Sequence, residues 1–249
     1  MTLIGGRLKA RLADTDEDVR ACQRLRHSCF FEGRGVENAD DSGLDADEFD
    51  VHCRHMMVED SRTGTLVCCF RIMPLNNGSE ISRSYSAKYY NLDALEDYPG
   101  KMVEMGRFCV HPEWKDPAII RVAWAGMTKF VDDEGVQMLF GCSSFYGVDA
   151  DEYMDAFALL KERHLAPSRW LPTVKAPRVF EFAARLGLKR PDMKLALSRM
   201  PPLLRTYLIM GGWVSDHAVI DNELNTLHVF TGVEIARVPK ARARLLRGG

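Results

Sequence analysis

The 249-residue sequence contains no long hydrophobic run. Its longest apolar stretches, such as residues 66–70 and 156–160, fall far short of the roughly 20 residues that cross a bilayer as a helix. Residues 1–11 mix glycine, arginine and lysine into a short apolar run, which differs from the continuous hydrophobic region of a secretory signal. We therefore expect a cytoplasmic protein without a transmembrane helix.

The cysteine spacing of structural metal sites is also missing. The seven cysteines are an odd number and include no Cys-x-x-Cys pair, so neither a disulfide framework nor a zinc ribbon is indicated. His52, Cys53 and His55 lie close together, but no further cluster of ligands follows them. We predict no metal site.

A surplus of either charge is lacking, because the formal net charge is only −2 with 27% charged residues. This balance gives no support for binding nucleic acid. The 46% hydrophobic content is enough to bury a substantial core. We predict one domain over residues 1–249, with a core at about 7–200 and C-terminal strands and a basic tail at about 201–249.

The pattern of apolar residues predicts alternating strands and helices. A helix is expected over 16–30, and strands over 55–59 and 65–72 joined by a turn at 60–64. A strand follows at 102–110, then a helix that begins at Asp116-Pro117, buries Ile120, Ala123 and Met127, and ends at Gly135. A strand over 136–145 and a helix over 151–163 come next, and residues 201–239 are expected to form further strands or hairpins with a turn at 221–222.

Residues 32–60 form an acidic segment of low periodicity. They carry ten acidic residues against two arginines, Arg34 and Arg54. We interpret this segment as a long functional loop or a disordered one.

A carboxylate and a guanidinium lie three residues apart in the otherwise apolar strand 102–110. Glu104 and Arg107 would be costly there unless they are paired or used. Residues at i and i+3 of a regular strand point to opposite faces, so both reach one cleft only if the strand has a bulge or is splayed.

Several charged residues, taken in order, resemble a known signature. Arg26-x-x-x-Phe30, Asp47-x-x-Asp50, Arg71 and Glu104-x-x-Arg107 are similar to the pattern of the acyl-homoserine lactone synthases. Those enzymes have a GNAT-like fold and take acyl chains from acyl carrier protein. This resemblance covers about the first 110 residues.

The rest of the chain resembles a sister family, the ornithine lipid biosynthesis N-acyltransferases. The segments that carry this resemblance are CSSFYGVD at 142–149, HLAP at 164–167, WLP at 170–172, PPLLRTYLIMGG at 201–212 and IDNELNT at 220–226. The resemblance implies an α/β (α+β) fold with a GNAT-like, central, mixed and mostly antiparallel sheet that has a splayed strand pair and is flanked by helices. It also implies transfer of a long-chain, 3-hydroxy fatty acyl group to the α-amine of L-ornithine, with no tightly bound cofactor.

The segment after strand 102–110 favours a carrier protein as acyl donor. Acetyl-CoA-dependent GNAT enzymes hold the pyrophosphate on a glycine-rich loop at a helix N-terminus. Residues 111–117, HPEWKDP, contain no glycine and two prolines, which have no N–H to donate. The phosphopantetheine arm of acyl carrier protein has a single phosphodiester and needs less of such a loop.

Two basic runs suggest docking surfaces. Residues 161–190 contain eight Lys or Arg against two Glu, and within them we assign Arg163, Lys175 and Arg178 to docking of the acidic carrier protein. Residues 237–249 contain five Lys or Arg and no acid, so this run could instead contact anionic membrane lipid at the inner face of the cytoplasmic membrane.

These features define a predicted active site. Glu104 would be the general base, with a pKa raised by its apolar neighbours, and backbone N–H groups near Phe108 and Cys109 would stabilise the oxyanion. The remaining residues are assigned to substrate binding. Arg71 and Arg107 orient loop carboxylates or the pantetheine arm, Asp47 and Asp50 bind the cationic ends of ornithine, and Arg26, Phe30 and Ser143 complete the set.

Three alternatives remain open at the level of sequence. The chain could be an acyl-homoserine lactone synthase that uses S-adenosylmethionine, or a small-molecule acetyltransferase that uses acetyl-CoA. It could also be a GNAT-like module without catalytic activity that binds a membrane or a partner.

Overall fold

The computed structural model describes residues 2–32 and 42–247 and divides the chain into two compact units. Unit 1 comprises the described residues of 1–74, 103–136 and 240–249, and unit 2 comprises residues 75–102 and 137–239. Residues 33–41 of the acidic segment and residues 248–249 of the basic tail lie outside the described part of the chain. The single domain predicted over 1–249 stays a prediction.

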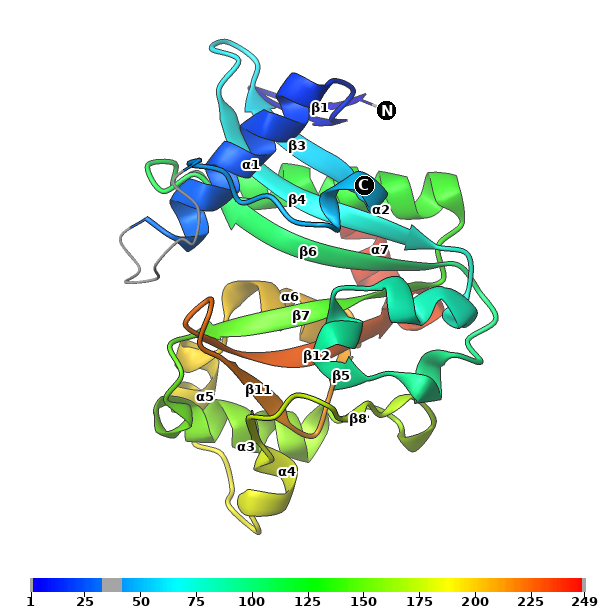
Figure 1. Ribbon diagram of the computed structural model, residues 1–249, viewed down its shortest axis with the longest axis vertical. Coiled ribbons are helices and arrows are strands. Elements are labelled where there is room, and N and C mark those ends of the chain that lie inside the picture. Colours follow the sequence, from blue (N-terminus) through cyan, green and yellow to red (C-terminus); the bar gives the residue numbers. More distant parts are fainter. Residues whose placement is uncertain (1, 33–41, 248–249) are drawn as a thin grey trace. The chain divides into compact units, whose positions relative to one another are not determined.

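Unit 1 is a sheet with helices on both faces (Figure 1). The strand order is β1-β2-β3-β4-β6, and the pairs from β1 to β4 are antiparallel. The bounds are β1 Thr2–Gly5, β2 Leu8–Leu12, β3 Arg54–Asp60, β4 Leu66–Leu75 and β6 Met102–Val110, with helices α1 Asp16–Phe30, α2 Ala118–Glu134 and α7 Lys240–Leu246.

Neighbouring methionines of β3 show how the two faces of this sheet are covered. Met57 belongs to a buried cluster with Cys22 and Leu25 of α1. Met56 lies instead against α2, where the position of a Cβ on Gly126 would be 3.3 Å from the Met56 sulfur. Because successive side chains of a strand point to opposite faces, α1 and α2 cover opposite sides of the sheet.

The helix boundaries follow from their caps. The Thr15 side chain accepts a hydrogen bond from the backbone N–H of Asp18, and three acidic residues fill the first turn of α1. The Asp116 side chain accepts from the N–H of Ala118 at the start of α2, and Gly135 ends that helix with φ 67°. One detail of the predicted helical face was wrong, because Ile119 is buried and Ile120 is 37% exposed.

Unit 2 also combines an antiparallel sheet with helices. Strands β7, β12, β11 and β9 lie in that order, and β10 pairs with β12. Their bounds are β7 Met138–Tyr146, β9 Val179–Phe180, β10 Trp213–Val214, β11 Ala218–Asp221 and β12 Thr226–Glu234, and β5 Tyr90–Asn91 pairs with β8 Thr173–Val174 in a small separate sheet. The helices are α3 Met154–Arg163, α4 Phe182–Arg185, α5 Met193–Arg199 and α6 Pro202–Ile209.

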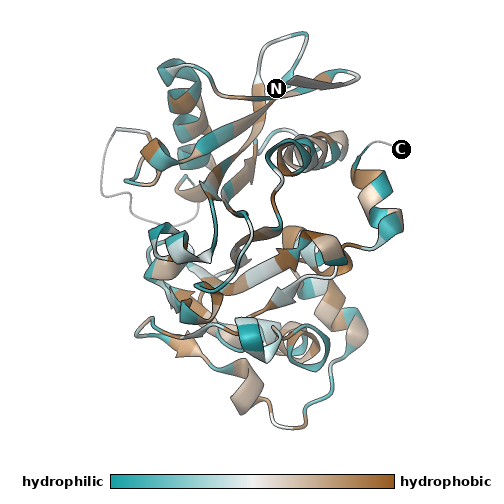
Figure 2. Cartoon of the chain, turned by 90° about the vertical axis from the view of Figure 1, so that its right-hand side faces the viewer, coloured by the Kyte–Doolittle hydropathy of each residue, from teal (hydrophilic) through white to brown (hydrophobic). Residues whose placement is uncertain are grey.

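The core of unit 2 lies between the sheet and helices α3 to α6. Phe145 of β7 and Val229 of β12 pack with Phe157 of α3, Phe182 of α4 and Leu204 of α6. Figure 2 shows hydrophobic residues along the strands and on the helices.

The expectation of strands or hairpins throughout residues 201–239 was wrong at its beginning, where α6 forms. Pro202 stands in the first turn of this helix, where its missing N–H costs nothing, and Leu204 and Tyr207 are spaced to bury one face. The predicted turn at 221–222 lies where β11 ends, as expected. The fold class, with a mostly antiparallel sheet flanked by helices, is as predicted.

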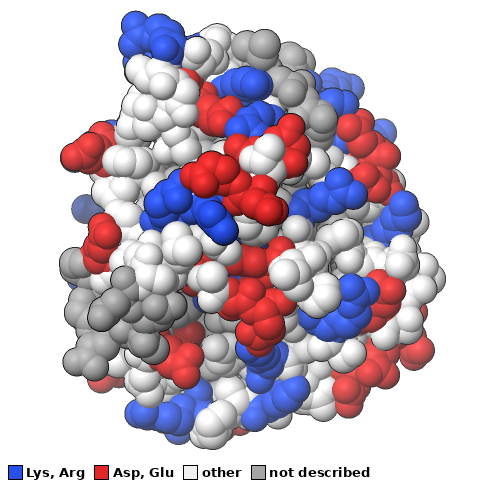
Figure 3. All heavy atoms as spheres, turned by 45° about the horizontal axis from the view of Figure 1, so that its top comes forward, with Lys and Arg blue, Asp and Glu red and all other residues white. Residues whose placement is uncertain are grey.

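No helix in the described ranges 2–32 and 42–247 is both long enough and apolar enough to cross a membrane. The face shown in Figure 3 carries Lys and Arg intermixed with Asp and Glu.

Candidate active site

The centre of the candidate site is a guanidinium fully enclosed in unit 1. Arg26 of α1 has 0% exposure. Its Nη1 and Nη2 donate to the two carboxylate oxygens of Asp50 at 2.9 and 2.8 Å, and its Nε donates to Asp45 at 3.1 Å. Burial by itself would lower the pKa of Arg26, but these carboxylates outweigh burial and raise it.

The Asp50 carboxylate is held by three side chains from α1 and β4. Besides Arg26, its carboxylate accepts from Gln23 Nε2 at 2.8 Å and from Arg71 Nη1 of β4 at 3.0 Å. Burial favours the neutral acid, yet the hydrogen bonds and positive charges prevail and lower the pKa of Asp50. The carboxylate is therefore ionised at neutral pH and joins α1 to β4.

Two further guanidinium groups hold the neighbouring loop carboxylates. Arg71, 3% exposed, also forms an ion pair with Asp47. Arg107 of β6 pairs with Asp45, with Nε 3.1 Å from Oδ2, and with Asp47 at 3.7 Å. Three arginines, one each from α1, β4 and β6, thus form ion pairs with one segment, residues 45–50.

Aromatic rings flank this ion-pair cluster. The Arg107 guanidinium lies 5.7 Å from the ring centroid of Phe30, and that of Arg71 lies 5.9 Å from the ring of Phe49. The structure therefore brings together the predicted residues Arg26, Phe30, Asp47, Asp50, Arg71 and Arg107.

Arg107 has a backbone conformation that is rare inside a strand. Its φ is 53°, in the left-handed region, whereas β6 continues on both sides. This irregularity is the kind that Glu104 and Arg107 require if both are to reach the same side of the strand. Non-glycine residues in such a conformation are concentrated at functional sites.

Glu104 is buried beside the same cluster. It is 5% exposed. Burial raises the pKa of the Cys53 thiol to about 12; Arg71 opposes this rise, and the charges of Glu104, Asp50 and Asp47 add to it. The charge of Glu104 thus acts on Cys53 in the same sense as those of Asp47 and Asp50, and Glu104 does not face bulk solvent.

Phe108 and Cys109 follow directly on β6. The Phe108 ring stacks on Phe70 with a centroid distance of 5.3 Å, and the Cys109 Sγ lies 3.6 Å from the Sγ of Cys69. Both side chains are engaged in packing. The assignment of backbone N–H groups at these two residues to the oxyanion stays a prediction.

Sequence reasoning missed Asp45, Gln23 and His55. Asp45 is 6% exposed and bridges Arg26 and Arg107, and the buried His55 contacts the Asp50 carbonyl at 3.3 Å. Asp45 shares the acidic segment with Asp47 and Asp50, so the spacing of its acids was the available signal. No group of three or more potential metal ligands is assembled among residues 2–32 and 42–247.

The remaining predicted residues lie in unit 2. Ser143 of β7 is buried, and its hydroxyl accepts a hydrogen bond from Thr231 Oγ1 at 2.9 Å. Arg163, Lys175 and Arg178 are exposed. Arg163 pairs with Glu162 at 3.2 Å, and Lys175 donates to the carbonyl of Ala87.

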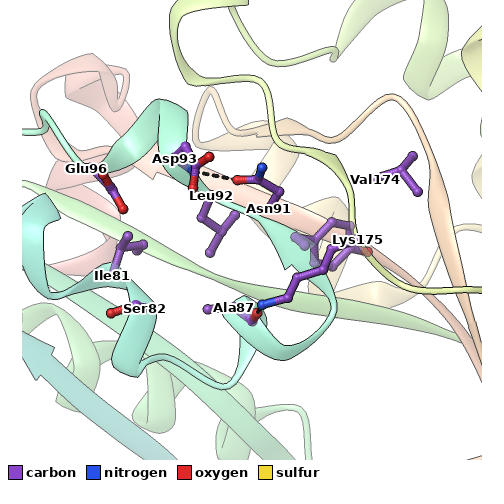
Figure 4. A pocket seen from close by; sticks show the side chains of 10 residues that line it. Ile81, Ser82, Ala87, Asn91, Leu92, Asp93, Glu96, Val174 and Lys175 are labelled. Atoms are coloured by element: carbon purple, nitrogen blue, oxygen red, sulfur yellow. Dashed lines mark hydrogen bonds between the residues drawn. The ribbon is translucent and has the colours of Figure 1, made fainter.

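Lys175 also lines a cavity of about 330 Å³ in unit 2. Glu96 and Lys175 lie on opposite sides of this cavity, and Asp93 lies between them (Figure 4). The other lining residues are Ile81, Ser82, Ala87, Tyr90, Asn91, Leu92 and Val174.

Comparison with known proteins defines the class. A family model described as an acetyltransferase (GNAT) domain matches residues 25–125, which include Arg26, the loop carboxylates, Glu104 and Arg107. The structure of FeeM, an N-acyl amino acid synthase from uncultured soil microbes, superimposes with a TM-score of 0.53 over 95% of this chain and 98% of that one. At 10% identity this similarity concerns the fold alone. Residues 25–125 thus match the acetyltransferase domain of the GNAT class.

The particular family follows from sequence relatives. The L-ornithine N(alpha)-acyltransferase of Rhodobacter capsulatus is 32% identical over 227 residues, which are 88% of this chain and 86% of the relative. The enzyme of the same name from Brucella abortus is 30% identical and aligns with 94% of this chain and 86% of its own length. The chain belongs to the L-ornithine N(alpha)-acyltransferase family.

Proposed function

We propose that this enzyme transfers a long-chain, 3-hydroxy fatty acyl group from acyl carrier protein to the α-amine of L-ornithine and so forms a lyso-ornithine lipid. The observation that carries the proposal is the burial of Glu104, three residues before Arg107 of the ion-pair cluster on β6. The named residues are four carboxylates, of Asp45, Asp47, Asp50 and Glu104, against three guanidinium groups. This surplus of one negative charge suits a cationic acceptor.

The proposed reaction uses Glu104 as the general base. The α-ammonium group of ornithine gives a proton to Glu104, directly or through one water, and the free amine attacks the thioester carbonyl carbon. The C–N bond forms, the attacking nitrogen releases its second proton to solvent, the C–S bond then breaks, and the departing thiolate takes up the proton held by Glu104. The products are an amide and the free thiol of the carrier.

Asp47 and Asp50 differ in exposure, and we therefore assign them different roles in the binding of ornithine. The Asp50 side chain is 6% exposed, and its oxygens accept hydrogen bonds from Gln23, Arg26 and Arg71. Asp47, 18% exposed, is the more accessible of the two. We assign direct contact with an ammonium group to Asp47 and the ordering of the loop to Asp50.

The start of α2 supports a carrier protein rather than coenzyme A as donor. Asp116 accepts from the N–H of Ala118 at 2.8 Å, and the Asp116 carbonyl accepts from the N–H of Ile119. A carboxylate therefore occupies the N-terminal turn where a pyrophosphate would otherwise bind. The exposed Arg163, Lys175 and Arg178 remain our candidates for docking the acidic carrier, and peripheral contact with anionic lipid is a further proposed interaction.

Product identification by mass spectrometry tests this function. Purified protein is incubated with 3-hydroxyacyl carrier protein and ornithine, and in parallel with S-adenosylmethionine or with acyl-CoA as donor. We expect an N-acylornithine from the first mixture. A homoserine lactone, or faster turnover with acyl-CoA, would contradict the proposal.

A further inference from the structure

Unit 2 exposes several large apolar side chains within one short segment, residues 187–199. Leu188 is 99% exposed, Leu195 and Leu197 are each 45% exposed, and Met193 is 38% exposed. Single exposed apolar residues are common on protein surfaces, whereas a group of them rimmed by polar residues marks an interaction surface.

This exposure belongs to a folded segment and not to a frayed one. Leu186, Ala196 and Met200 belong to the buried core of unit 2 and fix the chain before, within and after the segment. The N–H of Asp192 donates to Asp155 of α3 at 2.9 Å. The exposed side chains are therefore held away from the core of unit 2, and Figure 1 shows α5 beside α3 in this unit.

Cations surround these apolar side chains. The segment contains Lys189, Arg190, Lys194 and Arg199 against one acid, Asp192. The Asp192 carboxylate is occupied as the cap of α5, where it accepts from the N–H groups of Lys194 and Leu195 at 2.9 and 3.0 Å. Lys189 is ion-paired with Asp155 of α3 at 3.1 Å, so Arg190, Lys194 and Arg199 supply the positive charge beside these apolar side chains.

We propose that residues 187–199 dock this enzyme on an anionic membrane, with Leu188 entering the boundary between headgroups and acyl chains. Exposed leucine side chains flanked by Lys and Arg are the combination that binds such boundaries. The choice of a lipid surface over a protein partner rests on the proposed function, because its single-chain lipid product must pass into a bilayer.

A second basic element allows a matched comparison. Helix α7 in unit 1 also combines cations with an exposed leucine, Leu245, which is 64% exposed. Arg247, directly after this helix, is ion-paired with Asp132 at 2.6 Å. The docking surface proposed here is in unit 2, so α7 serves as the control.

Co-sedimentation with vesicles tests the proposal. The probe is an equal mixture of phosphatidylcholine and phosphatidylglycerol, with pure phosphatidylcholine as reference. We expect the full-length protein to bind the anionic vesicles and to dissociate as salt is raised. Leu188→Ser should weaken binding at least about fivefold and the combined Leu188→Ser, Leu195→Ser, Leu197→Ser variant at least about fiftyfold, while Leu245→Ser changes it less than about twofold.

Three results would overturn the proposal: no binding of the wild type to anionic vesicles, equal binding of the triple variant, or loss of binding in Leu245→Ser instead. A vesicle-free acyl-transfer assay separates a protein partner from a lipid. If the triple variant raised the KM for the acyl carrier protein there, the surface would dock the carrier and the membrane assignment would be wrong. Failure of ornithine acylation in the wild type, with vesicle binding intact, would refute the proposed function and leave the surface standing.

Discussion

Arg26 and Asp50 meet in two hydrogen bonds of 2.9 and 2.8 Å inside unit 1, one from each terminal nitrogen of the guanidinium. A lysine at position 26 would keep the positive charge, but it cannot donate along two parallel directions, and it could not also reach Asp45.

Arg26→Lys is therefore expected to destabilise the protein by about 2–4 kcal/mol, because buried carboxylates lose partners. The shift of the urea unfolding midpoint measures this effect. Arg24→Lys, at a side chain 52% exposed on the same helix, is the control and should change stability by less than about 0.5 kcal/mol. Equal midpoints for the two variants would contradict the structural role of Arg26.

Glu104→Gln should abolish the proposed base and keep the size of the side chain. We expect kcat to fall by about 10²-fold or more, with the unfolding midpoint nearly unchanged. Glu113→Gln, an exposed glutamate just after the same strand, is the matched control and should retain full activity. If kcat of Glu104→Gln matched that of the wild type, Glu104 would be removed from the mechanism.

Substitution of Asp50 should mainly lower stability, whereas substitution of Asp47 should mainly weaken the binding of ornithine. Asp50→Asn leaves Arg26 and Arg71 short of a charge and should cost about 3–5 kcal/mol of stability. Asp47→Asn is expected to cost less than about 1 kcal/mol but to raise the KM for ornithine about tenfold. Parallel urea titrations and ornithine titrations measure both quantities. An unchanged KM in Asp47→Asn would reject its contact with the substrate ammonium group.

The stability of unit 2 should decrease in acid because of His228. Burial, with a smaller contribution from His217, lowers the pKa of His228 to about 3, so the folded state holds this imidazole neutral. The unfolded state takes up a proton below a pKa near 6.5. The contribution of neutral His228 to the free energy of unfolding is thus fully present above about pH 6.5. It is lost as the pH falls toward 3, by up to about 1.4 kcal/mol per pH unit.

His228→Gln should reduce the slope of the unfolding free energy against pH between about pH 6 and pH 4. The reduction should correspond to the uptake of about one proton on unfolding, and urea midpoints at each pH measure it. The exposed His52→Gln should leave the wild-type slope unchanged. Burial also lowers the pKa of His55 and of His164, so only the difference between variant and wild type reports His228. A variant slope equal to that of the wild type would exclude the neutral, buried His228.

Local patterns were sufficient to predict most elements of the fold. The cap at Thr15, the turn after Asp60 and Gly135 determine boundaries through contacts within a few residues, and these boundaries agree with the structure. The shift from Ile120 to Ile119 and the helix α6 depended on packing against distant residues, which periodicity does not specify.

The candidate site was predictable in its members but not in its connections. Arg26, Arg71 and Arg107 were singled out by the motif that they resemble. Their common attachment to residues 45–50 depends on pairs far apart along the chain, such as Arg107 with Asp45. Asp45 was missed for this reason, since one more acid in an acidic segment is not distinguishable until its buried partners are known. The i, i+3 spacing of Glu104 and Arg107 indicated an irregular strand, but it did not indicate that Arg107 itself has the left-handed backbone.

The attachment of one loop to α1, β4 and β6 also determines when catalytic competence arises during folding. Residues 45–50 have charged partners from all three elements. In a folding intermediate that lacks α1, β4 or β6, a carboxylate of residues 45–50 lacks one of its charged partners. Recovery of acyl transfer after dilution from urea should therefore follow the slowest phase of tertiary assembly and lag behind the return of helical circular dichroism.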